Sequence, residues 1–131
     1  MSRNEFFQLE RSGPATILTV QVSRISESEG IEQFFATLNA LVQEGHKQLV
    51  LDLHQVQLVS SRALGKLVVF QRRLEQAGGW IRLCRLSDYL QELFRITQLG
   101  KLFQVFPDRD QALQNAPPAE TQTLAPDNPA S

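Results

Sequence analysis

A continuous apolar run, Leu49 to Leu51, places the strongest constraint on how this chain folds. Such a run suits a strand covered on both faces, because a strand with one face in water alternates apolar and polar residues. After Val59 the apolar residues recur at helical spacing, at Ala63, Leu67, Phe70 and Leu74. A buried strand followed by an amphipathic helix indicates a sheet flanked by helices.

Two serines, Ser60 and Ser61, stand at the predicted start of that helix. Serine is a favoured N-cap because its oxygen accepts a hydrogen bond from an unpaired amide of the first turn, which is worth about 1 kcal/mol relative to alanine. Either serine could be the cap.

The rest of the chain alternates strand and helix patterns, preceded by a hairpin. We expect strands at residues 6–10, 15–22, 48–53, 80–85 and 103–106, and helices at 31–42, 61–77, 88–98 and 108–115. Alternation implies parallel neighbours with right-handed crossovers. The sequence therefore predicts an α/β fold with a mixed sheet of about five strands, an N-terminal β-hairpin and three to four helices.

Composition divides the chain into two parts. Residues 1–115 are expected to form one domain, whereas residues 116–131 hold four of the six prolines and are expected to be a disordered tail.

The charge balance favours a protein partner. Thirteen basic and fourteen acidic residues give a net charge of -1, which draws the chain neither to nucleic acid nor to an anionic membrane.

No apolar run is long enough for membrane insertion, and residues 1–11 lack the apolar core of a secretion signal. We therefore expect a cytoplasmic protein.

Catalytic patterns are missing from the sequence. His46 and His54 flank the strand that ends in Asp52, too far apart to share a metal ion without a return loop, and are expected to be surface or loop histidines. Cys84 is expected to be a buried strand residue. No Gly-rich phosphate loop or nucleophile elbow is present. The expectation is a protein that is not an enzyme and has no metal or cofactor.

The predicted helix at 61–77 also carries a basic row. Arg62, Lys66, Val69 and Arg73 follow one another at helical spacing, opposite the apolar stripe, so they should face outward. Such a row is usually a solvated face. The exposed valine within it favours a partner surface.

The segment from Ser60 to Gly65 resembles the STAS domains, the family of sulfate transporters and anti-sigma factor antagonists. Members carry a strand ending in Asp and then a motif close to Asp-Ser-Ser-Gly-Leu-Gly; here Ser61, Leu64 and Gly65 match it, and Ser60, Arg62 and Ala63 depart from it. The resemblance spans about residues 5–114 and continues downstream in Gly78-Gly79, Thr97-Gln98-Leu99, the run from Lys101 to Asp108, and Ala112-Leu113.

The resemblance implies a function based on binding. In regulatory members, the serine equivalent to Ser61 is phosphorylated by a histidine-kinase-like ATPase that is also the anti-sigma factor, and a phosphatase restores it. By this resemblance Ser61 is the phosphorylation candidate, with Ser60 second. The partner-binding candidates are Ser60, Ser61, Arg62, Lys66, Val69 and Arg73.

A second interpretation keeps the fold without the phosphoswitch. The chain would then be a non-phosphorylated STAS subunit or scaffold of a membrane transporter complex, for example of the lipid-transport ABC type. The altered motif is the observation that favours this alternative.

Overall fold

The computed structural model describes residues 6–26 and 28–114. The strands are β1 (Phe7–Ser12), β2 (Ala15–Val20), β3 (Arg24–Ile25), β4 (Gln48–Asp52), β5 (Leu58–Val59), β6 (Trp80–Cys84) and β7 (Gln104–Phe106). The helices are α1 (Ser28–Gln43), α2 (Ser61–Gln76), α3 (Asp88–Ile96), the short 3-10 helix η1 (Leu99–Lys101) and α4 (Arg109–Gln114). The proposed tail lies outside the described residues.

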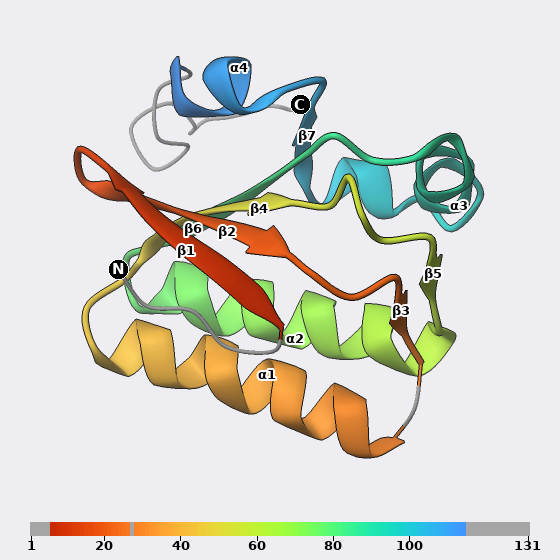
Figure 1. The fold of residues 1–131 in the computed structure, drawn as a ribbon, viewed down its shortest axis with the longest axis horizontal. Helices are drawn as coiled ribbons and strands as arrows, with labels where there is room; N and C mark the ends of the chain where they lie inside the picture. The colour runs from red at the N-terminus through yellow and green to blue at the C-terminus, as the bar shows by residue number, and fades with distance from the viewer. Residues whose placement is uncertain (1–5, 27, 115–131) are drawn as a thin grey trace.

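Five strands form one mixed sheet in the order β1-β2-β4-β6-β7 (Figure 1). β1 and β2 are an antiparallel hairpin, and every other neighbouring pair in this sheet is parallel. The predicted mixed sheet with an N-terminal hairpin is confirmed. The four predicted helices correspond to α1, α2, α3 and α4.

The central strands β2, β4 and β6 are buried on both faces, as the apolar run predicted for β4. Leu49 and Leu51 of β4 belong to a large core cluster with residues of α1 and α2. Val50, between them, belongs to a smaller cluster with Trp80 and Ala112 of α4. The two helices α1 and α2 lie on one side of the sheet and α4 on the other (Figure 1).

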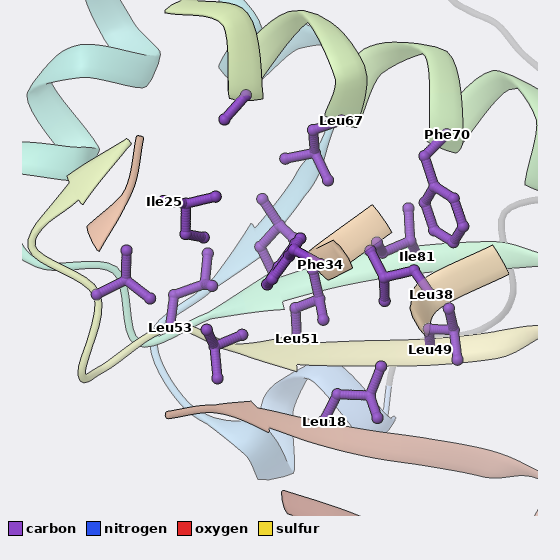
Figure 2. Close-up of a cluster of buried hydrophobic side chains, with 14 of the residues drawn as sticks. Leu18, Ile25, Phe34, Leu38, Leu49, Leu51, Leu53, Leu67, Phe70 and Ile81 are labelled. Atoms are coloured by element: carbon purple, nitrogen blue, oxygen red, sulfur yellow. The ribbon is translucent and has the colours of Figure 1, made fainter. Parts of the chain in front are cut away.

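The large core joins the sheet to the α1 and α2 pair. Figure 2 shows side chains of the strands and of both helices pointing into one space, among them Leu18, Leu49, Phe34, Leu38, Leu67 and Phe70. The helical spacing found in the sequence thus marks the face that α2 packs on the sheet.

Three short elements, β3, β5 and η1, were not predicted from the sequence. β3 and β5 are two residues each and pair in parallel, Arg24 with Leu58 and Ile25 with Val59. A two-residue strand is too short to show an alternating pattern, so only the folded chain reveals it. Element ends also differ by a few residues: β2 ends at Val20 rather than 22, and α3 ends at Ile96 rather than 98.

Gly79 makes the tight entry into β6, and we predict that it does not tolerate a side chain. A Cβ there would lie 2.3 Å from the carbonyl oxygen of Lys47 and 2.7 Å from a methyl carbon of Leu74. Gly79→Ala should lower the free energy of unfolding by about 1–3 kcal/mol, because backbone must move to admit the methyl group. Gly100→Ala is the matched control, since a Cβ at Gly100 meets nothing within 4 Å. Equal unfolding midpoints in a urea titration would contradict this.

Candidate functional site

The link between β4 and α2 is held at both ends. At its start, the Leu53 amide donates to the carbonyl of Cys84 at 3.0 Å. At its end, the amides of Gln57 and Leu58 both donate to the carbonyl of Ser23, at 2.8 and 3.0 Å. These hydrogen bonds therefore fix the path of the link from β4 to Ser60.

The loop before α1 lies beside this link. Pairing of β3 with β5 brings the connection from β2 to α1 against the connection from β4 to α2. Figure 1 shows β3 and β5 side by side, each leading into the N-terminal end of its helix. The starts of α1 and α2 therefore form one end of the molecule.

Ser60 is the N-cap of α2. Its backbone is extended, with φ −76° and ψ 162°, and its Oγ accepts a hydrogen bond from the Ala63 amide at 3.1 Å. Its own amide donates to the carbonyl of Ile25 at 3.1 Å. The hydroxyl of Ser60 is thus committed to the helix, which settles which of the two serines is the cap.

Ser61 is the first residue of α2 and is exposed. Among the residues that the structure describes, its hydroxyl has no hydrogen-bond partner. The first turn of α2 carries no acidic residue, so the positive end of the helix dipole is not offset there by a carboxylate of that turn.

The basic row borders the junction of α2 with α1. Arg62 donates to Glu32 of α1 at 3.1 Å, and the Lys66 ammonium lies 3.6 Å from the same carboxylate. Val69 is 49% exposed, and Arg73 is exposed. The row lies on the surface, and its first two cations, Arg62 and Lys66, both contact Glu32 of α1.

Asp52, at the carboxyl end of β4, is buried at the centre of a cluster of charged side chains that was not predicted from the sequence. Asp52 has no exposed surface and accepts hydrogen bonds from Arg85 Nη2 at 2.7 Å and from Arg109 Nε at 2.7 Å. The His54 amide and Nδ1 lie 3.1 and 2.9 Å from its Oδ1. Arg109 also contacts Glu10 at 3.3 Å. This Asp52 cluster joins β4, the residue after β6, and α4.

The cluster keeps Asp52 ionised. Burial by itself raises the pKa of the Asp52 carboxyl, but the hydrogen bonds from Arg85, Arg109 and His54 outweigh burial and hold that pKa well below its usual range. Arg85 adopts a left-handed φ of 58°, which is uncommon for a residue other than glycine. This conformation is held by the paired hydrogen bonds between its guanidinium and Asp52.

Sequence reasoning missed this cluster because its members are far apart in the chain. Arg85 and Arg109 lie 33 and 57 residues after Asp52. The one available signal was an acidic residue at the end of an otherwise apolar strand, which requires a charged partner once it is buried.

The remaining candidate side chains have structural contacts. Burial, followed by the charge of Asp52, raises the pKa of the Cys84 thiol to about 12, so this cysteine stays protonated. His46 Nδ1 lies 2.8 Å from Thr16 Oγ1. Within residues 6–26 and 28–114, no group of three His, Cys, Asp or Glu side chains is arranged to hold a metal ion.

Comparison with known sequences matches residues 8–112 to the STAS domain. The chain belongs to the STAS domain family. It is 32% identical over 88 residues to the Bordetella bronchiseptica protein named "Putative anti-sigma factor antagonist BtrV", which covers 67% of this chain and 76% of that protein.

Solved structures show the same fold. An anti-sigma factor antagonist from Mycobacterium paratuberculosis superposes with a TM-score of 0.71 at 20% identity, covering 82% of this chain and 89% of that one. The Bacillus cell fate determinant SpoIIAA in its phosphorylated form gives a TM-score of 0.61 at 18% identity, covering 82% and 96%. In the described part of this STAS domain, no helix has the length and apolar character to cross a bilayer.

The Asp52 cluster should dominate the acid stability of the domain. Asp52→Asn should lower the free energy of unfolding by about 3 kcal/mol, the low end for breaking a buried ion pair. We expect the low end of the range because 40% of the Arg85 side chain remains exposed to solvent.

The pH dependence follows from the direction of the Asp52 pKa shift. As pH falls below the usual carboxyl pKa of 3.8, the unfolded chain takes up a proton that the folded protein still excludes, so stability falls with pH. The free energy of unfolding of Asp52→Asn should fall less steeply than that of the wild type over the same pH range, as measured by urea unfolding at successive pH values. Parallel slopes for the two proteins would show that Asp52 does not carry this dependence.

Proposed function

We propose that this STAS domain is a cytoplasmic anti-sigma factor antagonist of a partner-switching pathway, and that Ser61 is its phosphorylated residue. The observation that carries the proposal is the different use of two adjacent hydroxyls. Ser60 Oγ is bonded to the Ala63 amide, whereas the Ser61 side chain is exposed and unbonded among the described residues.

The surroundings of Ser61 suit a phosphate. A phosphoserine carries about −1.5 to −2 charges, which the positive end of a helix dipole stabilises. No acidic residue of the first turn of α2 opposes that charge. Arg62 follows directly and is exposed, so it can exchange its contact with Glu32 for one with phosphate.

The switch acts on docking rather than on folding. Ser61 is outside the core, so a phosphate there displaces no packed side chain. A partner shaped for a neutral hydroxyl would instead meet a bulky anion within its contact surface. The proposed contact surface consists of Ser60, Ser61, Arg62, Lys66, Val69 and Arg73.

The partner we propose is an anti-sigma factor with serine kinase activity of the histidine-kinase-like ATPase type, opposed by a phosphatase. The relative from Bordetella bronchiseptica carries the name "Putative anti-sigma factor antagonist BtrV", and SpoIIAA is known in a phosphorylated form. These relatives favour the regulator over the transporter scaffold. In this role the protein acts by binding and is not itself an enzyme.

The test compares a charged and a neutral replacement at Ser61. We predict that Ser61→Asp binds the purified anti-sigma kinase of the source organism at least about tenfold more weakly than Ser61→Ala, because the contact would have to remove water from a carboxylate that a surface shaped for a neutral hydroxyl does not accommodate. Calorimetric titration measures both affinities. Ser61→Asp should unfold at the same temperature or higher, since an acidic residue suits the first turn.

Ser87→Ala provides the matched control, because Ser87 is the N-cap of α3 and lies outside the proposed contact surface. It should lower the free energy of unfolding by about 1 kcal/mol through loss of the cap, and leave kinase binding and phosphorylation at Ser61 in place. Equal affinities of Ser61→Asp and Ser61→Ala would overturn the switch at this position.

A further inference from the structure

Most of the exposed large apolar side chains gather near one edge of the sheet. Of the five in the described part of the chain, four lie between residues 89 and 105, and Val69 of α2 is the fifth. Three of the four come from adjoining elements: Ile96 ends α3, Leu102 follows η1, and Val105 lies in β7. Because η1 contacts both α3 and β7, we treat these three side chains as one patch, the β7 edge patch. An exposed apolar patch marks an interaction surface.

The backbone of β7 is open on its outer side. β7 is the last strand in the order β1-β2-β4-β6-β7, so among the described strands its only neighbour is β6. The Arg85 amide donates to the Phe106 carbonyl at 3.2 Å, which shows that the backbone of Phe106 faces β6. Successive residues of a parallel strand direct their backbone groups to alternate sides, so Val105 directs its amide and its carbonyl away from β6. Val105 therefore presents one donor and one acceptor at the open edge.

The shortness of β7 limits what can pair with it. The strand has three residues, and Pro107, which follows it, has no amide to donate. An extended peptide added to a sheet edge is held by a row of main-chain hydrogen bonds, and β7 offers one outward pair. The occupant of this edge must therefore also cover the apolar side chains beside it.

We propose that the occupant is a second copy of this chain, joined by antiparallel pairing of β7 with β7 about a two-fold axis at Val105. In such a pair the Val105 amide of each copy donates to the Val105 carbonyl of the other, so both outward groups are bonded. Val105 pairs in register with Leu83, a member of the large core, so the two Val105 side chains meet on the face covered by α1 and α2. Each copy then brings its own β7 edge patch to cover that of the other.

Charge permits this contact between identical surfaces. Residues 96–106 contain one charged side chain, that of Lys101. Lys101 precedes Val105 by four residues, so the two copies hold their Lys101 side chains on opposite sides of the two-fold axis. The β7 edge patch shares no residue with the surface proposed for the kinase, so this inference does not rest on the proposed function.

The dimer should be weak, because the β7 edge patch is small for a protein interface. We expect a dissociation constant of about 100 µM for the full chain, measured by sedimentation equilibrium from about 10 µM to about 1 mM. Val105→Lys should raise that constant at least about tenfold, because it places two like charges together at the axis. Gln8→Lys is the matched control, since Gln8 is an exposed residue of the opposite edge strand, β1, and should dimerise like the wild type.

Amide hydrogen exchange of the wild type, followed by NMR, tests the pairing without a substitution. The Val105 amide should exchange about threefold more slowly at about 1 mM than at about 50 µM, because dimer formation buries it in a hydrogen bond. The Gln104 amide faces β6 and should exchange at the same rate at both concentrations.

Two results would overturn the inference, and neither bears on the proposed function. One is a chain that stays monomeric at the highest concentration. The other is a dimer that Val105→Lys leaves intact, or in which the Val105 amide exchanges at the rate of the monomer, because such a dimer forms through another surface.

Discussion

A carboxylate without access to water holds the ends of the central strands of this domain. Asp52 closes β4, and its charge is stable only because Arg85 and Arg109 donate to it from the ends of two other segments. Arg109 is the first residue of α4, so its contact with Asp52 also holds α4 on the face of the sheet opposite α1 and α2. A second arginine, Arg82, is fully buried and donates to the carbonyl of Ala112 at 2.6 Å, which attaches the other end of α4.

The same strand end positions the candidate site. The link that follows Asp52 is tied to Cys84 at its start and to Ser23 at its end, so the N-terminus of α2 has little freedom to move. A rigid frame of this kind suits a surface switch, because modification of an exposed hydroxyl changes what a partner meets without changing the fold. In the function that we propose, adjacent residues therefore have different roles: Ser60 stabilises the helix, and Ser61 is available to a partner.

Much of the fold follows from local patterns in the sequence. The apolar run from Leu49 to Leu51 indicated a strand covered on both faces. The helical spacing of apolar residues in α2 indicated its buried side. Both patterns are visible in the sequence because they involve residues close together in the chain. The pairing of β3 with β5 had no local signature, and the only local sign of the Asp52 cluster was an acidic residue at the end of an apolar strand, since each joins segments distant in the chain. The sequence predicted that one of two serines caps α2 but did not say which. The hydrogen bond from the Ala63 amide to Ser60 identifies Ser60 as the cap.

We propose that Ser60 serves as the helix cap and that Ser61 is the site of phosphorylation. The most direct test is to incubate the protein with the purified anti-sigma kinase and ATP, measure the intact mass, and locate the phosphate by fragmentation. We expect a single phosphate, on Ser61. A phosphate on Ser60, or an unmodified protein after incubation with a kinase that binds it, would show that the two serines do not have these separate roles.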